Sequence, residues 1–266
     1  MRQASRQQAL WPWVLAVAAV VAVAAWWLLR PNPGKPSGDE VARPPSVAAP
    51  ATPPVAPPAI QHPIAAAADP ALPALADSDG EVWTALVQGV GDDAPLALLI
   101  RDHLIQRIVV MVDNLTQPRM PRTASALKPM PGAFAVAESA GGMRIAAENA
   151  RRYAPWVQAF TRADANSLAA AYTRFYPLFQ QAYQELGYPD RYFNDRLVQV
   201  IDHLLETPEP EAPGVEPDGR GKYRFTDPAL ESRSAGQKAL LRLGREQERA
   251  VKAQLRQIRA ALAGGG

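Results

Sequence analysis

An uncharged apolar run near the start of the chain constrains its architecture most. Residues 10–29 read "LWPWVLAVAAVVAVAAWWLL", which is twenty residues without a charge. About twenty apolar residues are enough for a helix to cross the hydrocarbon core of a membrane. Tryptophans stand at both ends of the run, where indole rings favour the membrane interface. The run therefore predicts a single transmembrane helix over 10–29, preceded by a short cytoplasmic tail over 1–9.

A cleaved signal peptide is the alternative explanation of this run. The apolar region of a signal peptide is normally about 7–15 residues long and is followed by a small-residue cleavage site. Here "WWLLR" follows the alanines, which favours an uncleaved anchor. Lysine and arginine are nearly balanced across the run, so they set its orientation only weakly.

Residues 30–76 form a second distinct region, rich in proline and alanine and poor in charge. Such a composition cannot bury a packed core, so we interpret the region as a disordered linker. Its simplest function is that of an inert spacer. Similar tethers occur on the periplasmic side of single-pass bacterial proteins. We therefore expect a bacterial inner-membrane protein whose C-terminal domain is periplasmic.

The remaining residues, 77–263, predict a mainly α domain with a minor β-hairpin. Gly141 and Gly142 mark the hairpin turn within 133–146, and residues 116–132 are expected to form a loop. Asp93 is the expected N-cap of an apolar helix that ends near residue 115. Gly187 and the pair Asp227-Pro228 fit helix boundaries. The other predicted helices cover 79–88, 148–163, 165–186, 191–206, 228–243 and 245–262.

Composition argues against several kinds of site. The chain has no cysteine, which excludes disulfides and a thiol nucleophile. Its three histidines are never spaced i, i+3 or i+4, so we expect no metal site, and no motif predicts a cofactor. The chain has 28 basic and 26 acidic residues, of which residues 1–76 hold five and three. The domain is thus neutral, and nucleic acid is not an expected partner.

Three stretches of the domain resemble a known family. They are "RRYAPWVQAF", "YTRFYPLFQQAYQELGYPDRYFNDRLVQVIDHLLETPEP" and "KYRFTDPALESRSAGQKALLRLG". They are similar to a proteobacterial family classed as domain of unknown function 3014, and the similarity covers most of 77–262. This resemblance implies a bacterial envelope protein. It transfers no activity and no catalytic residue.

Five side chains of the two central helices are candidate binding residues. Tyr172, Tyr176 and Tyr183 border the apolar face of helix 165–186, either as the rim of the core or as an aromatic floor for a glycan or peptide. Asn194 falls within the apolar face of helix 191–206, either as a structural amide or as a polar group facing a cleft. Arg196 lies on the flank of that helix.

Two charged stripes complete the candidates. The first, on the polar face of helix 191–206, is either solvated and salt-bridged or able to do acid–base work or hold a hard cation; it comprises Arg191, Asp195, Asp202 and Glu206. The second, on the last helix, either pairs with the acidic stripe or is solvated, or else it docks an acidic partner or anionic lipid; it comprises Arg245, Arg249, Lys252, Arg256 and Arg259.

Two functions therefore stand against each other. The first is a non-catalytic scaffold or binding protein, anchored in the membrane, with an envelope protein or cell-wall partner. The alternative is a hydrolase of envelope glycan or peptide that uses a carboxylate such as Glu231. A deep polar cleft with a buried carboxylate would favour the enzyme, and a shallow aromatic or basic groove would favour binding.

Overall fold

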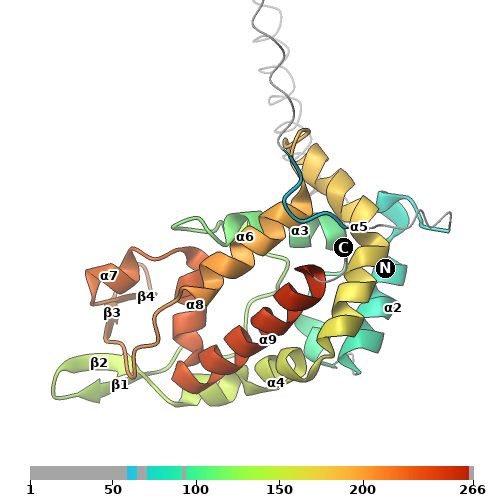
Figure 1. The fold of residues 1–266 in the computed structure, drawn as a ribbon. Helices are drawn as coiled ribbons and strands as arrows, with labels where there is room; N and C mark the ends of the chain where they lie inside the picture. Colours follow the sequence, from blue (N-terminus) through green and yellow to red (C-terminus); the bar gives the residue numbers. More distant parts are fainter. Residues whose placement is uncertain (1–58, 65–70, 92–93, 264–266) are drawn as a thin grey trace, which may run out of the picture. The chain divides into compact units, whose positions relative to one another are not determined.

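The computed structural model describes residues 59–64, 71–91 and 94–263 of the 266-residue chain. They form a mainly helical domain with two small antiparallel strand pairs (Figure 1). The longer helices are α2 (Asp79–Val90), α3 (Leu104–Asn114), α4 (Glu148–Arg162), α5 (Ala165–Glu185), α6 (Phe193–Leu205), α8 (Ala235–Leu243) and α9 (Arg245–Ala263). The short ones are α7 (Pro228–Glu231) and the 3₁₀ turns η1 (Leu75–Asp77), η2 (Ala94–Leu98) and η3 (Arg122–Ala124).

The predicted transmembrane helix, the tail before it and the linker up to residue 58 lie outside the described residues. Among the residues that are described, no helix is both long and apolar enough to cross a membrane. The last part of the predicted linker does make contacts. Leu75 is buried, and residues 61 and 62 bond to α6.

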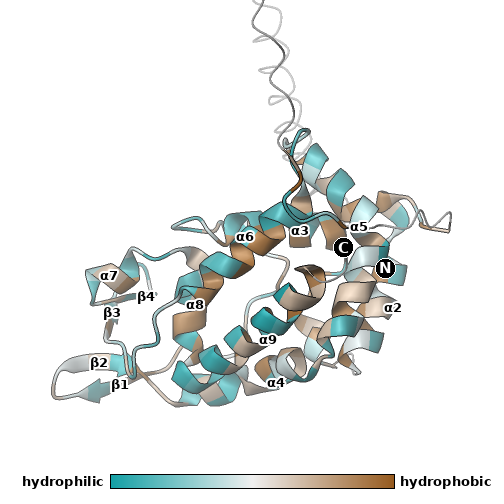
Figure 2. Ribbon diagram, in the orientation of Figure 1, coloured by the Kyte–Doolittle hydropathy of each residue, from teal (hydrophilic) through white to brown (hydrophobic). Residues whose placement is uncertain are grey.

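Helix α5 is central to the packing, because it contacts α2, α3, α6 and α9. Its N-cap is Asp164, whose carboxylate accepts a hydrogen bond from the Ser167 N–H at 2.7 Å. The helix ends before Gly187, whose φ of 113° suits glycine and confirms the predicted boundary. Pro177 is exposed, as expected for a proline on the polar face. Figure 2 shows the same two-sided character in α6, with polar colour on one side and apolar colour on the other.

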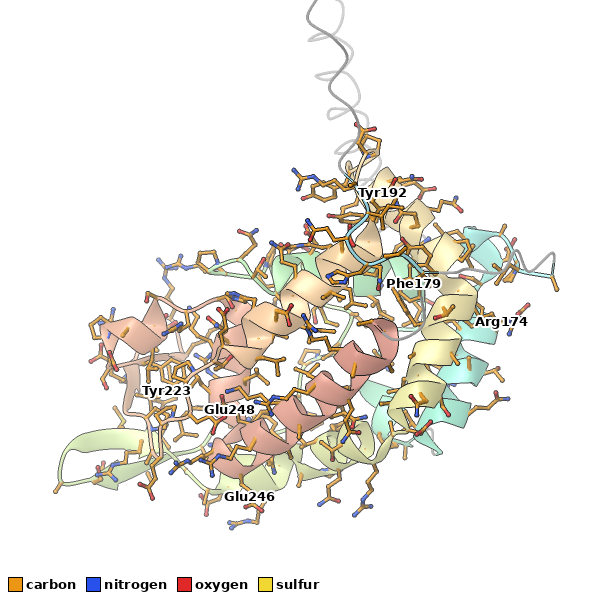
Figure 3. The ribbon with its side chains drawn as sticks, viewed as in Figure 1. Arg174, Phe179, Tyr192, Tyr223, Glu246 and Glu248 are labelled. Carbon is orange, nitrogen blue, oxygen red and sulfur yellow. The ribbon has the colours of Figure 1, made fainter. Side chains whose placement is uncertain are left out.

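An aromatic cluster joins α5 to α6 at the centre of the core. Phe193 is 1% exposed, and its ring stacks on that of Phe179 with centroids 5.7 Å apart. Tyr183 and Tyr172 pack against the same ring at 5.5 and 6.4 Å. Figure 3 places Phe179 between the two helices. The cluster therefore fixes α6 on α5.

The predicted helix up to residue 115 is wrong in its first half, and its predicted N-cap, Asp93, lies outside the described residues. Residues 94–98 form the 3₁₀ turn η2, and Leu99 makes an isolated β-bridge with Leu127 of the following loop. Helix α3 begins only at Leu104. The Asp79 carboxylate of α2 accepts hydrogen bonds from the N–H groups of His103 and Leu104, both at 2.8 Å. A cap supplied by another helix leaves no local pattern in the sequence.

The predicted hairpin is confirmed, and the sequence missed a second strand pair. Strands β1 (Val136–Ser139) and β2 (Gly142–Ile145) pair across the two predicted glycines. Strands β3 (Val215–Pro217) and β4 (Tyr223–Phe225) pair in the same antiparallel way. With three residues each, β3 and β4 are too short to establish an alternating pattern.

The predicted continuous helix over 228–243 is broken into α7 and α8. Asp227 caps α7 as expected, and Ser234 caps α8 by accepting from the Gln237 N–H at 3.2 Å. The start of α8 rests on the end of α3, where the Gly236 N–H donates to the Leu115 carbonyl at 2.9 Å. A Cβ at Gly236 would lie 2.6 Å from the Leu204 side chain and 3.0 Å from the Leu115 carbonyl oxygen, so a larger residue would push these groups apart.

Candidate functional site

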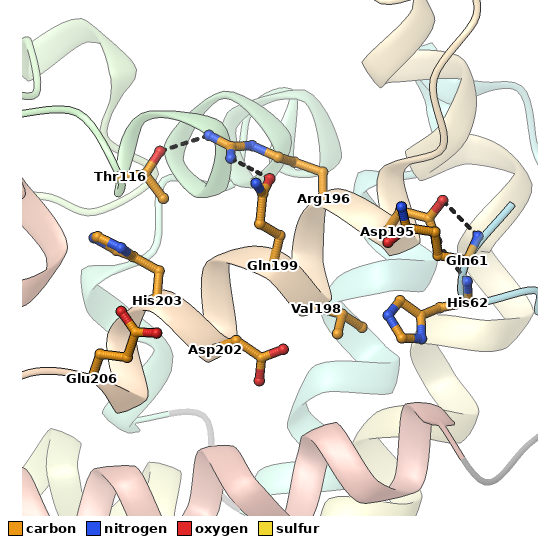
Figure 4. A pocket seen from close by; sticks show the side chains of 10 residues that line it. All are labelled: Gln61, His62, Thr116, Asp195, Arg196, Val198, Gln199, Asp202, His203 and Glu206. Atoms are coloured by element: carbon orange, nitrogen blue, oxygen red, sulfur yellow. Dashed lines mark hydrogen bonds between the residues drawn. The ribbon is translucent and has the colours of Figure 1, made fainter. Parts of the chain in front are cut away.

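The first turn of α6 holds a distant segment of the chain, residues 59–64. The Asp195 carboxylate accepts hydrogen bonds from the N–H of Gln61 at 3.1 Å and from that of His62 at 2.7 Å. The Asn194 amide nitrogen donates to the His62 carbonyl at 2.9 Å. Only main-chain atoms of the segment take part in these bonds (Figure 4). Helix α6 therefore binds a non-helical segment through hydrogen bonds to its main chain, and these bonds do not involve the side chains of the segment.

A groove of about 570 Å³ continues from this contact along α6 (Figure 4). Helix α6 supplies most of its lining, with Gln61 and His62 at one end and Thr116 opposite. We call this feature the α6 groove. The exposed side chains Gln199 and Glu206 belong to it, so part of its wall faces solvent.

Arg196 forms a wall of the α6 groove and is held by the end of α3. Its guanidinium bonds the Asp113 carboxylate at 2.8 Å, the Asp113 carbonyl at 2.7 Å and the Thr116 hydroxyl at 2.7 Å. It also donates to Gln199 at 2.8 Å. Both members of the ion pair are largely buried, with side chains 16% and 15% exposed. The charge of Arg196 is thus cancelled within the chain.

The other ionisable groups of the α6 groove differ in how they are engaged. Asp202 forms an ion pair with Arg259 of α9 and accepts one of its N–H groups at 2.9 Å. His203 shares a hydrogen bond with the Ser234 hydroxyl at 2.9 Å. Among the described residues, Glu206 has no ion-pair partner. The acidic stripe predicted from the sequence is therefore divided between structural contacts and solvent.

The three candidate tyrosines lie in and beside the aromatic cluster, and none of them lines the α6 groove. Tyr183 is 2% exposed and stacks on Tyr188 at 4.6 Å. Burial raises the pKa of Tyr172 well above its usual value, and its hydroxyl has no hydrogen-bond partner among the described residues. The Tyr176 hydroxyl donates to Gln180 at 3.1 Å, and burial raises the pKa of Tyr176 as well.

Three cations of the α9 stripe are paired within the domain. Arg249 and Lys252 both reach Glu209, at 2.7 and 3.0 Å, and these hydrogen bonds lower the pKa of Glu209 to about 2. Arg259 reaches Asp202, as described above. Arg245 and Arg256 are exposed, and neither has an ion pair among the described residues.

Glu231, the carboxylate proposed above as a catalytic group of a hydrolase, makes two contacts within the local fold. One oxygen accepts from the Phe225 N–H at 3.0 Å, and the other accepts from Lys238 at 3.3 Å. These contacts tie α7 to β4 and α8. In the described part of the chain, no three side chains of histidine, aspartate or glutamate gather as a metal site would require.

Sequence reasoning missed the segment that Asn194 and Asp195 hold. Gln61 and His62 stand within "AIQHPI", where the alternation of proline and alanine gives way to larger apolar and polar residues. That change in composition is the one signal that marks the segment. Sequence reasoning also missed Glu209, which pairs with Arg249 and Lys252 of the α9 stripe.

Comparison with known protein families gives a match. The family model described as "Protein of unknown function (DUF3014)" matches residues 104–259, more than half of the chain. The chain therefore belongs to this family. No curated protein and no solved structure matches it.

Proposed function

We propose that this protein is a membrane-anchored, non-catalytic binding domain of the bacterial cell envelope, which holds a polypeptide segment in the α6 groove. The observation that carries the proposal is the set of hydrogen bonds that α6 makes to residues 59–64. Asn194 and Asp195 bind three main-chain groups of two consecutive residues, Gln61 and His62, more than 130 positions away in the sequence. Bonds to main-chain atoms suit any segment whose backbone takes the same path.

The use made of the carboxylates supports binding over hydrolysis. General acid–base catalysis needs a carboxyl group free to exchange a proton with a substrate. Glu231 and Asp202 are each held by a cation, and Asp195 is occupied by two N–H groups. Glu206 has no ion-pair partner among the described residues, but it is exposed to solvent rather than enclosed in a deep cleft. Glu248 is buried and has a raised pKa, but it lies outside the α6 groove.

The membrane part of the proposal rests on residues 10–29 and predicts a definite topology. A phosphatase that is active only in the periplasm is expected to be active when fused after Gly266. The reason is that one uncharged span and a long linker would carry the domain across the membrane. An inactive phosphatase together with an active cytoplasmic reporter at the same position would reverse the orientation.

The binding part of the proposal is tested by separating the groove from its own segment. A chain that begins at residue 71 lacks residues 59–64, and a labelled peptide of residues 57–66 is expected to bind it. Asp195→Asn is expected to weaken this binding about tenfold or more, because hydrogen bonds to a charged acceptor each contribute roughly 1.5–3 kcal/mol. Fluorescence anisotropy measures both affinities.

Asp190→Asn is the matched control for charge. Asp190 is exposed and lies before α6, outside the groove, so its loss is expected to leave peptide affinity unchanged. A peptide that fails to bind the shortened chain, or that binds Asp195→Asn as well as the parent, would contradict a peptide-binding groove.

A further inference from the structure

A second cavity, of about 640 Å³, lies between the β3–β4 hairpin, α7, the start of α8 and the loop after α3. Figure 1 shows α7, β3 and β4 side by side next to α8. We call it the hairpin pocket. It shares no lining residue with the α6 groove, so the two sites can be tested separately.

The lining of the hairpin pocket is strongly basic. It contains six cationic side chains and two carboxylates; the cations are Arg119, Arg220, Lys222, Arg224, Lys238 and Arg242, and the carboxylates are Asp218 and Glu231. The residues from 77 onward carry no net charge, so this concentration of positive charge is local. A concave site lined by one sign of charge raises the local concentration of oppositely charged ligands.

The two carboxylates are engaged by the pocket's own structure. Asp218 accepts hydrogen bonds from the N–H groups of Arg220 at 2.8 Å and Lys222 at 2.9 Å, which shape the hairpin turn and lower the pKa of Asp218. Gly219 and Gly221 make this turn possible through left-handed φ values of 72° and 75°. The same turn presents Arg220 and Lys222 to the pocket as exposed side chains.

Two of the six cations already have carboxylate partners. Lys238 lies 3.3 Å from Glu231, and Arg224 lies 2.6 Å from Glu216, which is outside the pocket. In the described part of the chain, no ion pair is formed by the other four. These are Arg119, Arg220, Lys222 and Arg242. The pocket thus offers four cations to a ligand.

Arg242 is the most informative of these four cations. Its guanidinium donates to the carbonyls of Lys238 and Tyr223, both at 3.2 Å, and lies 5.0 Å from the centre of the Phe225 ring. These contacts fix the fork of the guanidinium, while burial lowers the pKa of Arg242. The Glu231 carboxylate opposes this lowering of the pKa, but it forms no ion pair with Arg242. A desolvated cation without an ion pair is costly to keep, and an anionic ligand would offset that cost.

From this arrangement we propose that the hairpin pocket binds a phosphoryl group of an anionic ligand. Guanidinium groups bind phosphate oxygens through two parallel hydrogen bonds, and three of the four available cations are arginines. A phosphate monoester or a pyrophosphate carries two or more negative charges, and a phosphodiester carries one charge shared by two oxygens, which matches the guanidinium geometry. Tyr223 adds a ring to the wall, held in place by Phe134 at 5.7 Å, against which the organic part of a ligand can lie.

The proposal is tested with two phosphoryl probes on the full chain, purified in a nonionic detergent. The probes are inorganic pyrophosphate and a short-chain phosphatidylglycerol. Short-chain phosphatidylcholine, whose phosphate charge is balanced by its own choline, is the net-neutral comparison. Arg220→Gln with Lys222→Gln is expected to weaken binding of the preferred probe about tenfold or more, since each lost cation removes a charge-assisted contact. Isothermal titration calorimetry at low and high salt measures the affinities.

Arg144→Gln with Arg162→Gln is the matched control. Both arginines are exposed, neither lines the pocket, and no ion pair of either is found in the described part of the chain. This control pair removes the same charge and is expected to leave affinity unchanged. Arg242→Lys keeps the charge but loses the fork, and it is expected to weaken binding while preserving the pocket's overall charge.

The outcomes of the titrations distinguish the two sources of a phosphoryl group and test the proposal itself. Binding of pyrophosphate alone supports a soluble phosphorylated ligand, and binding of phosphatidylglycerol alone supports a lipid headgroup. Failure of both probes at low salt overturns the proposal. So does equal binding of phosphatidylcholine, or an equal loss of affinity in both double variants. None of these results depends on the peptide affinity of the α6 groove.

Discussion

Replacing Phe193 by alanine is expected to lower the free energy of unfolding by about 3–5 kcal/mol. Phe193 is 1% exposed and contacts the rings of Phe179, Tyr183 and Tyr172, so its removal leaves a cavity at the α5–α6 contact. Domains are stable by only about 5–15 kcal/mol, so this is a large share of the total. Urea unfolding of the chain from residue 55 onward, followed by circular dichroism, measures the change.

Leu186→Ala is the control for this substitution. Leu186 is 39% exposed at the end of α5, so shortening it is expected to change stability by roughly 0.5 kcal/mol or less. If Phe193→Ala costs no more than Leu186→Ala, then the aromatic cluster does not hold α6 on α5.

The helices that the sequence predicted best are those whose apolar residues repeat with a helical period. The predicted 165–186 and 191–206 became α5 (Ala165–Glu185) and α6 (Phe193–Leu205). Their periodic faces are long enough to specify the helix without help from elsewhere. At α3 the cap comes from Asp79 of another helix, and at α8 the bond from the Gly236 N–H to the Leu115 carbonyl adds to the local cap Ser234. Apolar periodicity registers neither a cap nor a distant bond, so it misplaces these boundaries.

The binding features were only partly predictable, for the same reason. The burial of Asn194 follows from its position on the apolar face of α6, and the residue is 0% exposed. Its bond to the His62 carbonyl does not follow, because nothing in the α6 sequence specifies which distant segment it meets. Glu209 pairs with α9 from a loop, and the hairpin pocket depends on a three-residue strand pair. The helical period of apolar residues does not predict which helix a loop contacts.

The domain is expected to be less stable at pH 8 than at pH 5, and Glu248→Gln is expected to remove most of that difference. Glu248 of α9 is 1% exposed (labelled in Figure 3), and its burial raises its pKa from 4.5 to about 7. The neighbouring Lys252, at 3.4 Å, opposes this rise, but Lys252 also forms an ion pair with Glu209. Glu248 therefore prefers to be protonated in the folded domain.

The sign of the effect follows from the protons bound in each state. Between pH 4.5 and about 7 the unfolded chain loses the Glu248 proton while the folded domain keeps it. Stability then falls as pH rises through this window and levels off above it, by up to about 3 kcal/mol. Glu209 acts oppositely at low pH: its pKa is lowered to about 2, so its contribution is lost as pH falls below 4.5. These two groups together place maximum stability near pH 5.

Urea unfolding of the parent chain and of Glu248→Gln at pH 4, 5, 6, 7 and 8 tests this expectation. Glu246→Gln is the matched control, because Glu246 is exposed on the same helix and its loss is expected to leave the parent's pH dependence intact. Glutamine at 248 cannot ionise, so the variant should gain stability over the parent between pH 5 and 8 while still losing stability below pH 4.5 through Glu209. A parent curve that is flat from pH 5 to 8, or one that Glu248→Gln leaves unchanged, would mean that Glu248 is ionised and accommodated in the folded domain at neutral pH, with Lys252 as its counter-ion.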